Sequence, residues 1–226
     1  MPLLLYKMNE KLKYYLSGYP DELINKWKID TEGLYSITPR KDNEYYLKEI
    51  KKLIKVKNAN VLDICASVGG DSLALLIEFK NVDSNEFDKT RYKYLKSNLK
   101  NASKFYEFNS RTFNKDANKF FDKTSNTLAK LPRDHYTLIY MDPPWGGVDY
   151  KNQKDLQMFF GETNVIDYIN NTLIDRADYI AIKAPSNWLE SNIKKLHGIR
   201  LMKVFKIPIS KKKGTYYNVF LLKVKK

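Results

Sequence analysis

The strongest constraint on the fold of this chain is an alternation of short apolar runs with longer stretches of helical periodicity. Runs typical of strands lie near residues 61–64, 82–86, 111–114, 138–141 and 179–183. Stretches with helical spacing lie around residues 73–77, 88–99, 165–173 and 188–196. Strands joined by helices favour a parallel sheet that helices cover on both faces. Two closing runs, 201–208 and 216–224, are linked by Lys211-Lys212-Lys213-Gly214 and predict a hairpin with an antiparallel strand. The pattern therefore predicts an α/β fold.

The first 40 residues follow a different pattern. Residues 8–28 predict two short helices separated by Ser17-Gly18-Tyr19-Pro20, with Asp21 as the cap of the second helix. A loop is expected at 32–40, followed by a helix that Asp42 would cap. We therefore expect a helical extension at residues 1–40 and one domain at residues 41–226.

Composition limits the class of protein. The net charge of +14 favours a polyanionic partner such as nucleic acid, although only six of the 40 basic residues are arginines and dispersed lysines also occur on ordinary solvated surfaces. The single cysteine, Cys65, excludes an internal disulfide and fits a reducing compartment. One cysteine and two histidines, His135 and His197, argue against a zinc site.

The sequence also bears on location and assembly. No apolar run approaches the roughly 20 residues that a membrane span needs, and the first residues are charged too early for a signal peptide. We expect a protein that is intracellular, cytoplasmic or nuclear, and not secreted. We also expect no metal, no membrane contact and a monomer.

A proline turn ends the apolar run at residues 138–141. It reads Asp142-Pro143-Pro144-Trp145, and neither proline can donate a backbone hydrogen bond. Such a turn offers hydrogen-bond acceptors beside an indole ring, an arrangement that suits a flat base with an exocyclic amino group. The alternative is a stiff turn with a tryptophan that only packs.

A second motif follows the run at residues 61–64. Asp63 precedes a turn of small residues that contains Gly69 and Gly70, and a helix begins there, so backbone can approach a ligand closely. The Gly-x-Gly-x-x-Gly pattern of dinucleotide-binding proteins is absent. The spacing instead suits a nucleoside that carries an amino-acid moiety, with Asp63 near its ammonium group.

Acidic residues follow the next two strands. Glu86, with Asp88 close by, could bind ribose hydroxyls, and Asp116 could accept a hydrogen bond from an adenine amino group. Each has an ordinary alternative as a strand-end carboxylate, a helix cap or a loop residue. Because open α/β sheets bind ligands beyond the carboxyl ends of their strands, their joint occurrence favours a pocket for S-adenosylmethionine (SAM).

These motifs resemble the trimethylguanosine synthase family of RNA cap guanine-N2 methyltransferases, which are class I SAM-dependent methyltransferases. The family motif (Ser/Asp)-Pro-Pro-Trp-Gly-Gly-Pro-(Asp/Glu)-Tyr is matched by Asp142–Tyr150 except at Val148. Its aromatic-Ser-Val-Thr-Pro-Glu segment resembles Tyr35–Arg40, and its cofactor loop resembles Asp63–Asp71. The resemblance implies a Rossmann-like fold with a mostly parallel seven-stranded sheet.

Three positions depart from the family pattern. Ser67 lies where the family usually has glycine, and Arg40 replaces its usual acidic residue. The segment Lys183–Asn187 resembles Leu-Pro-Arg-Asn but lacks the arginine that would contact phosphate. Lys183 or the loop Lys211–Lys213 could replace that charge.

The resemblance implies methyl transfer from SAM to N2 of the guanine in a 7-methylguanosine RNA cap, with S-adenosylhomocysteine as the product. Trp145 would stack on the cationic base, and Asp142 and the Pro143 carbonyl would accept hydrogens from N2. Tyr35 and Trp27 could contact the base from its other face, although Trp27 fits a helix core equally well. The implied cofactor residues are Asp63, Ser67, Gly69, Gly70, Glu86, Asp116, Thr38 and Pro39. The other implied substrate residues are Lys183, Asn187, Lys211 and Lys212.

Two other functions stay open at this point. Asp-Pro-Pro-aromatic motifs also occur in enzymes that methylate exocyclic amines of adenine, cytosine or unmodified guanine in other RNA or DNA. A degenerate methyltransferase fold could instead serve as an RNA-binding subunit without activity. The intact Asp142–Trp145 motif argues against the second alternative.

Overall fold

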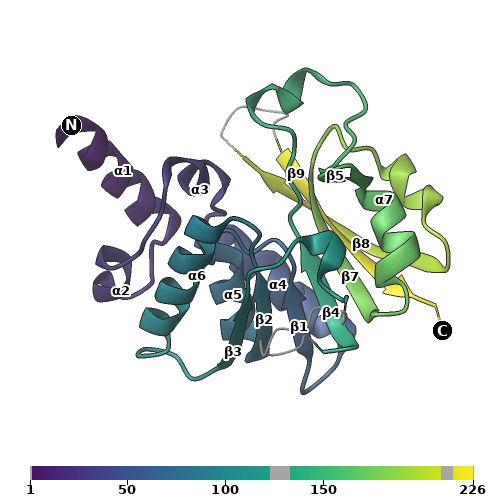
Figure 1. Cartoon of the computed structure of the whole chain (residues 1–226), viewed down its shortest axis with the longest axis horizontal. Coiled ribbons are helices and arrows are strands. Elements are labelled where there is room, and N and C mark those ends of the chain that lie inside the picture. Colours follow the sequence, from purple (N-terminus) through teal and green to yellow (C-terminus); the bar gives the residue numbers. More distant parts are fainter. Residues whose placement is uncertain (1, 123–132, 210–215, 226) are drawn as a thin grey trace. The chain divides into compact units, whose positions relative to one another are not determined.

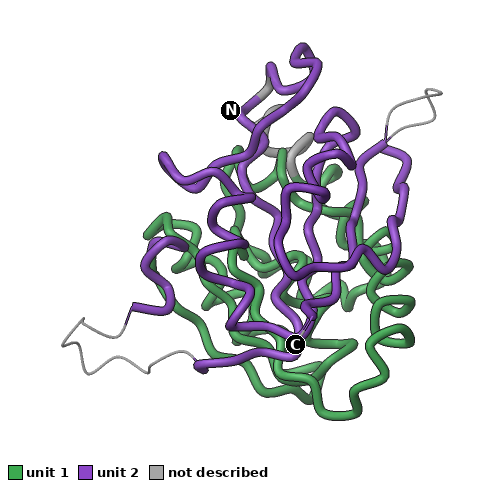
Figure 2. Tube along the Cα trace, turned by 90° about the vertical axis from the view of Figure 1, so that its right-hand side faces the viewer, with its two compact units in different colours: residues 1–115 green, residues 116–226 purple. Residues whose placement is uncertain are grey.

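The structure is a computed structural model that describes residues 2–122, 133–209 and 216–225. Figure 1 shows the chain as helices and strands. The chain consists of two compact units, residues 1–115 and residues 116–226, which Figure 2 shows in different colours.

The first unit begins with helices. Helix α1 spans Pro2–Tyr15, α2 spans Asp21–Asn25 and α3 spans Thr31–Ser36. The predicted break between the first two helices is therefore confirmed. The loop expected at 32–40 is wrong for its first half, because α3 forms there. The Asp30 carboxylate accepts a hydrogen bond from the Gly33 N–H at 2.7 Å and so caps this short helix.

Helix α4, Arg40–Ile54, follows directly after Pro39. The predicted cap at Asp42 is wrong, because Asp42 already lies in the first turn of the helix. Proline restricts the residue before it and favours a helix start after it, which explains the earlier beginning. The predicted division of the chain at residue 40 coincides with this helix start and otherwise stays a prediction.

The first unit contains three parallel strands in the order β3-β2-β1. Strand β1 spans Asn60–Asp63, β2 spans Asn81–Asn85 and β3 spans Asn109–Phe113. Helix α5, Gly70–Phe79, connects the first two strands, and α6, Lys89–Ala102, connects the second and third. Asp88 caps α6 by accepting from the backbone N–H groups of Thr90 and Arg91. Parallel strands joined by helices bring the segments after β1 and β2 to one edge of the sheet.

Four longer strands of the second unit follow the order β4-β7-β9-β8. Strand β4, Tyr136–Met141, pairs in parallel with β7, Ala177–Pro185. Strand β9, Tyr216–Val224, is antiparallel to both β7 and β8, Ile199–Pro208. The predicted link of the last two strands, Lys211–Gly214, lies outside the described residues. The side chains at 138–141 are fully buried, as expected for a central strand.

Short helices and one unexpected hairpin complete the second unit. Helix α7, Val165–Tyr168, continues into a π-helical turn, η3, Ile169–Leu173. The helix expected at 188–196 is a 3₁₀ helix, η4, Glu190–Lys195. Two further 3₁₀ helices are η1, Ala117–Lys119, and η2, Val148–Asn152. Strands β5, Phe159–Phe160, and β6, Thr163–Asn164, have two residues each and form a short hairpin that the sequence pattern does not predict.

The seven longer strands follow the order β3-β2-β1-β4-β7-β9-β8, with β9 antiparallel to its neighbours. This confirms the prediction of an α/β fold with a mostly parallel seven-stranded sheet and a closing antiparallel hairpin strand. In the described part of the chain, no helix has both the length and the apolar character needed to span a bilayer.

Candidate functional site

The predicted cofactor loop follows β1 in the first unit. Ser67 and Gly69 both have positive φ, +47° and +99°, and Gly69 is the residue directly before α5. A Cβ at Gly69 would lie 2.9 Å from Leu95 Cδ1, and one at Gly70 would lie 3.0 Å from Ile37 Cγ1. Both glycines therefore allow a tight turn at the electropositive start of α5.

Asp63 is fully buried at the end of β1. One carboxylate oxygen accepts a hydrogen bond from Ser72 Oγ at 2.6 Å, and the other lies 3.4 Å from the backbone nitrogen of Cys65. A buried carboxylate needs several donors. These interactions hold Asp63 at the base of the loop.

Glu86, directly after β2, binds the same loop. Its Oε2 accepts from the Ser67 N–H at 2.8 Å, and its Oε1 accepts from the Asp88 N–H at 2.9 Å. Arg91 Nε lies 3.6 Å from Oε1. Burial raises the pKa of Glu86, although the two N–H groups and Arg91 act in the opposite direction. Glu86 therefore shapes the cofactor loop in addition to any interaction with a ligand.

Two residues of this region were not singled out from the sequence. Phe87, between Glu86 and Asp88, exposes 71% of its surface. The Asn114 side-chain amide donates to the backbone oxygens of Glu86 and Phe87 at 2.7 and 2.8 Å. A large aromatic residue between two acidic residues at a strand end is the signal that could have identified Phe87.

The segment before α4 contributes Thr38, which is buried, and Pro39, which is half-buried. Arg40, the departure from the family pattern, has partners within the chain. Its Nε lies 2.7 Å from Glu44 Oε1, and its guanidinium lies 4.4 Å from the centre of the Tyr19 ring. These interactions give Arg40 a structural role at the start of α4.

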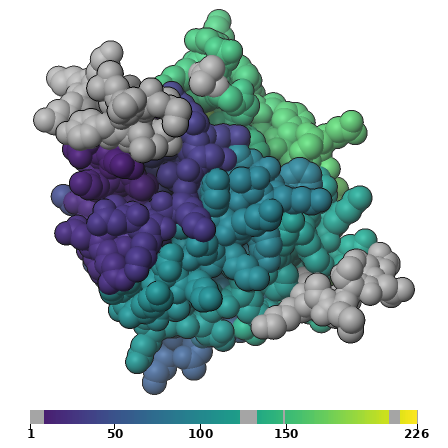
Figure 3. Space-filling model, turned by 60° about the vertical axis from the view of Figure 1, so that its left-hand side comes forward, coloured from purple at the N-terminus to yellow at the C-terminus, as the bar shows by residue number. Residues whose placement is uncertain are grey.

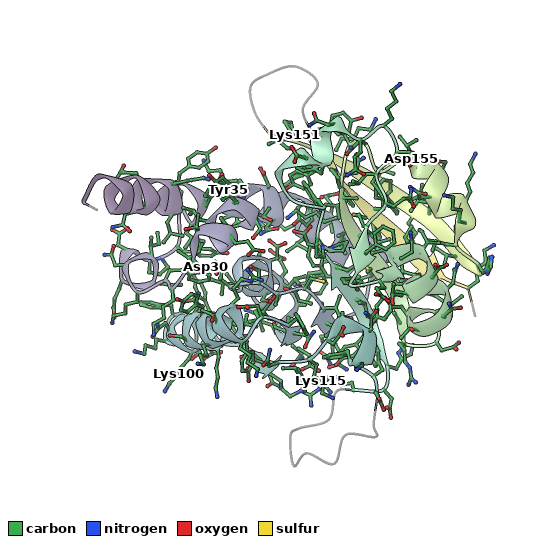
Figure 4. The ribbon with its side chains drawn as sticks, turned by 45° about the horizontal axis from the view of Figure 1, so that its top comes forward. Asp30, Tyr35, Lys100, Lys115, Lys151 and Asp155 are labelled. Carbon is green, nitrogen blue, oxygen red and sulfur yellow. The ribbon has the colours of Figure 1, made fainter. Side chains whose placement is uncertain are left out.

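Two aromatic residues of the first unit were predicted to contact the base. Trp27 exposes only 6% of its surface, which agrees with the alternative that it belongs to the core. Tyr35, on α3, exposes 73%, and the Lys11 ammonium lies 4.6 Å from the centre of its ring. Figure 4 labels Tyr35 on the outside of its helix. Of these two residues, only Tyr35 is therefore accessible to a ligand in this structure.

In the second unit, the turn after β4 forms an ionic and aromatic cluster. Lys183, on β7, is 3% exposed, and its Nζ lies 2.6 Å from Asp142 Oδ2. The same ammonium lies 5.9 Å from the centre of the Trp145 ring and 5.3 Å from that of Tyr217. The Trp145 ring also meets Tyr150 edge to face at 5.2 Å between centres. We call Asp142, Lys183, Trp145, Tyr150 and Tyr217 the proline-turn cluster.

Backbone geometry explains why this turn contains Gly-Gly after the two prolines. Pro143 is buried directly after Asp142. Gly146 and Gly147 have φ values of +88° and +80°, which favour glycine, and a Cβ at Gly147 would meet no atom within 4 Å. The backbone conformation, not space, therefore requires the second glycine. The buried Trp145 Nε1 has no hydrogen-bond partner among the described residues.

The remaining predicted site residues of the second unit bind backbone. The Asn187 side-chain amide donates to the oxygens of Tyr150 at 2.6 Å and Gln153 at 2.8 Å, and so holds the segment after the proline turn. Asp116 Oδ1 accepts from the Asn118 N–H at 2.9 Å as the cap of η1. Lys211 and Lys212 lie outside the described residues.

The structure thus gathers the predicted residues in two groups. Asp63, Ser67, Gly69, Gly70 and Glu86 lie together in the first unit. Asp142, Pro143, Trp145, Lys183 and Asn187 lie in or beside the proline turn of the second unit. Among the residues that the structure describes, no group of three or more His, Cys, Asp or Glu side chains could hold a metal ion.

Solved structures of methyltransferases have a similar fold. A methyltransferase from Pyrococcus furiosus is 15% identical, with 98% of this chain and 95% of that chain covered at a TM-score of 0.59. The tRNA m1G37 methyltransferase of M. jannaschii is 16% identical, with 86% and 51% covered and a TM-score of 0.54. Pyrococcus abyssi tRNA (uracil-54, C5)-methyltransferase, solved with S-adenosyl-L-homocysteine, is 12% identical, with 82% and 39% covered and a TM-score of 0.55. The fold is therefore the Rossmann-like fold of class I methyltransferases.

Sequence similarity assigns the chain to a narrower family than the fold does. The model of the RNA cap guanine-N2 methyltransferase family matches residues 58–218, which include both groups of predicted site residues. The chain belongs to this family of RNA methyltransferases, which confirms the resemblance found in the motifs. A curated relative, the uncharacterized protein L320 of Acanthamoeba polyphaga mimivirus, is 27% identical over 136 residues, or 59% of this chain and 49% of that protein. The chain spans about half the length of that relative.

Proposed function

We propose that this protein transfers a methyl group from SAM to the exocyclic N2 of guanine in a 7-methylguanosine RNA cap. The proline-turn cluster carries the proposal, because it combines a carboxylate, an adjacent proline carbonyl and a half-buried aromatic ring. A guanine amino group offers two hydrogens to acceptors, and a guanine ring offers a face for stacking. The family match to residues 58–218 supports the same substrate.

The first unit contains most of the residues suited to hold SAM, which when bound supplies an activated methyl group. Asp63 would pair with the ammonium of the amino-acid moiety, and Glu86 would accept hydrogen bonds from the ribose hydroxyls. The exposed Phe87 ring would pack on the adenine. Glycine at positions 69 and 70 permits the tight turn before α5, since a Cβ at either would crowd the side chains of Leu95 or Ile37.

The proline-turn cluster would orient the substrate. Trp145 would stack on the cationic guanine, and a cation–π interaction in a dry site contributes up to ~2 kcal/mol. Asp142 and the Pro143 carbonyl would accept the two N2 hydrogens and so aim the nitrogen lone pair. Orientation is the main contribution of the chain, because loss of the amine proton can follow transfer and needs no strong base.

The structure suggests a different role for Lys183 from the phosphate interaction expected from the sequence. Its ammonium is buried against Asp142, so we assign it to hold that carboxylate in place and to balance its charge. Exposed lysines elsewhere would then bind the phosphate bridge. The two hydrogen bonds of Asn187 to the backbone of Tyr150 and Gln153 likewise assign it to support the turn.

The test is transfer of labelled methyl from SAM to 7-methylguanosine triphosphate and, in parallel, to GTP. We expect transfer to the methylated nucleotide, loss of that transfer in Trp145→Ala, and partial activity in Trp145→Phe, which keeps a ring. SAM affinity, measured by calorimetry, should be unchanged in both variants because Trp145 lies in the other group of residues. Cap methylation at the wild-type rate by Trp145→Ala would overturn the proposal.

One observation favours a second substrate, a neutral base with an exocyclic amine in other RNA. The Lys183 ammonium already lies 5.9 Å from the centre of the Trp145 ring, so this ring has a cation–π partner within the chain before any cationic base binds. Transfer to GTP or uncapped RNA, without transfer to 7-methylguanosine triphosphate, would select this alternative. A protein that binds no SAM in the calorimeter would instead be a scaffold without activity.

A further inference from the structure

Helix α6 carries an unbalanced row of positive charge. Its sequence, Lys-Thr-Arg-Tyr-Lys-Tyr-Leu-Lys-Ser-Asn-Leu-Lys-Asn-Ala, contains four lysines, one arginine and no acidic residue. Lys89, Lys93, Lys96 and Lys100 are all exposed. We call these four side chains the lysine row. In Figure 3 the teal surface that includes α6 lies beside the purple surface of the N-terminal helices, and Figure 4 labels Lys100, the last residue of the row in the sequence.

The spacing places the lysine row on one face of the helix. The four residues follow each other at intervals of four, three and four, and such positions are neighbours on a helix surface. With a rise of about 1.5 Å per residue, the row extends over roughly 16 Å. It is therefore a linear array of charge that matches an extended polyanion better than a compact ligand.

The opposite side of α6 is fixed in the first unit. Leu95, Asn98 and Leu99 are buried. The Asn98 side chain accepts from the Lys28 N–H at 2.8 Å and donates to the oxygens of Lys28 and Val68 at 2.8 and 2.9 Å. Because these hydrogen bonds set the rotation of the helix, the lysine row must face away from them.

Acidic partners distinguish Arg91 from the lysine row. Arg91 lies 2.5 Å from Glu32 and 3.6 Å from Glu86. Among the ion pairs of the described residues, none involves Lys89, Lys93, Lys96 or Lys100. Like charges three and four residues apart repel each other, so this face of α6 is stabilised by any polyanion that binds along it.

Helix α4 shows that such a row is not general in this unit. It also carries several lysines, but Asp42, Glu44 and Glu49 lie among them, and Lys52 Nζ is 2.7 Å from Glu49 Oε1. The positive charge on α4 is therefore partly balanced locally. The positive charge on the exposed face of α6 is not balanced in this way.

The row also begins beside the predicted cofactor residues. Asp88 caps α6, and its backbone N–H donates to Glu86 at 2.9 Å. Lys89 is the next residue. A chain of phosphates along the row would therefore lead to the edge of the sheet at which open α/β proteins bind their ligands.

We propose that the lysine row binds the phosphate backbone of the RNA that follows the cap. This rests on the proposed function, which supplies the RNA, and it adds a surface outside the proline-turn cluster and the cofactor loop. Lysine acts on phosphate as a point charge and does not read base edges in the bidentate manner of arginine. The interaction is therefore independent of RNA sequence and sensitive to salt.

The test compares two variants of equal net charge. One is Lys89→Gln, Lys93→Gln, Lys96→Gln and Lys100→Gln. The matched control is Lys48→Gln, Lys52→Gln, Lys55→Gln and Lys57→Gln, which removes four exposed lysines in and after α4. The probes are a fluorescent single-stranded RNA of about 12 nucleotides, capped and uncapped, and 7-methylguanosine triphosphate, with affinity measured over a range of salt concentrations.

We expect the α6 variant to bind both RNAs at least tenfold more weakly at low salt, with an equal loss for each. The slope of log affinity against log salt should become shallower by about 0.7 for each phosphate that the variant no longer neutralises. The control should change RNA affinity less than twofold. Equal losses in the two variants, or no loss in the α6 variant, would overturn the lysine row as a binding surface.

Methyl transfer to 7-methylguanosine triphosphate separates this inference from the proposed function. That nucleotide has no RNA chain, so the α6 variant should methylate it at the wild-type rate. Failure of the wild-type protein to methylate it, together with weakened RNA binding by the α6 variant, would reject the proposed cap activity and keep the RNA surface.

Discussion

The Lys183 ammonium lies 2.6 Å from Asp142 Oδ2, which makes the carboxylate of the proline turn half of a buried ion pair. The side chains are 4% and 18% exposed, respectively. Lysine comes from β7 and aspartate from the end of β4, so two neighbouring strands fix the position of the carboxylate. An ionised Asp142 without this partner would leave a charge in a poorly solvated place.

Removal of Lys183 should therefore destabilise the protein more than removal of the whole pair. We expect Lys183→Met to lower the free energy of unfolding by about 3 kcal/mol, because the Asp142 charge loses its buried partner. The double variant Lys183→Met, Asp142→Asn should recover part of that loss. Urea unfolding of the two single variants and the double variant measures the coupling. Strictly additive effects would mean that the pair does not interact.

Glu86 should make stability depend on pH. Burial raises its pKa above the ordinary 4.5, although the Asp88 N–H, Arg91 and the Ser67 N–H favour the charged form. Folding then favours the protonated carboxyl, so this stabilisation is complete below pH 4.5 and is lost as pH rises through the raised pKa. The wild-type protein should therefore lose stability relative to Glu86→Gln as the pH rises from about 4 to about 7. The control is Glu107→Gln, at an exposed carboxyl, and the same gain in both variants would contradict the prediction.

Asn98 should be a main link between the N-terminal helices and the cofactor loop. Asn98→Ala removes two part-buried hydrogen bonds to Lys28 and one buried hydrogen bond to Val68, and leaves those backbone groups without these partners. We expect a loss of about 3 kcal/mol in the free energy of unfolding and weaker SAM binding. Asn101→Ala, at a half-buried site three residues later in α6, should change stability little. Similar losses in the two variants would show that the alanine substitution itself, not the link, is responsible.

Periodicity and turn chemistry are enough to predict the seven longer strands and most helices of this fold. The closing strand was expected at 216–224, and β9 has those bounds. Asp88 was weighed as a helix cap, and it caps α6. Such features depend on neighbours in the sequence, which is why single-sequence patterns find them. The short helix at Thr31–Ser36 was missed, because its stability depends on the Asp30 cap in a stretch with little periodicity.

Partners that are distant in the sequence could not be predicted in this way. The Asp142–Lys183 pair joins residues 41 positions apart, and the Asn98–Lys28 hydrogen bonds join residues 70 positions apart. Only pairing of β4 with β7, and packing of α6 against the N-terminal segment, bring them together. The sequence alone therefore suggests a phosphate contact for Lys183 and gives no sign of the role of Asn98. The burial of Trp27 agrees with the alternative that this residue belongs to the core, and its contact with the base stays a prediction.

Ser67 has a φ of +47° in the loop where the family usually has glycine. A left-handed conformation costs a residue with a Cβ roughly 1–2 kcal/mol, whereas glycine adopts it freely but loses about 0.5–1 kcal/mol to its more flexible unfolded state. Ser67→Gly should therefore raise the free energy of unfolding by about 0.5 kcal/mol. Ser67→Ala is the control at the same position, since it removes the hydroxyl and keeps the Cβ, and it should give no gain. Urea unfolding checks both variants, and stabilisation by alanine equal to that by glycine would assign the effect to the hydroxyl instead of the backbone.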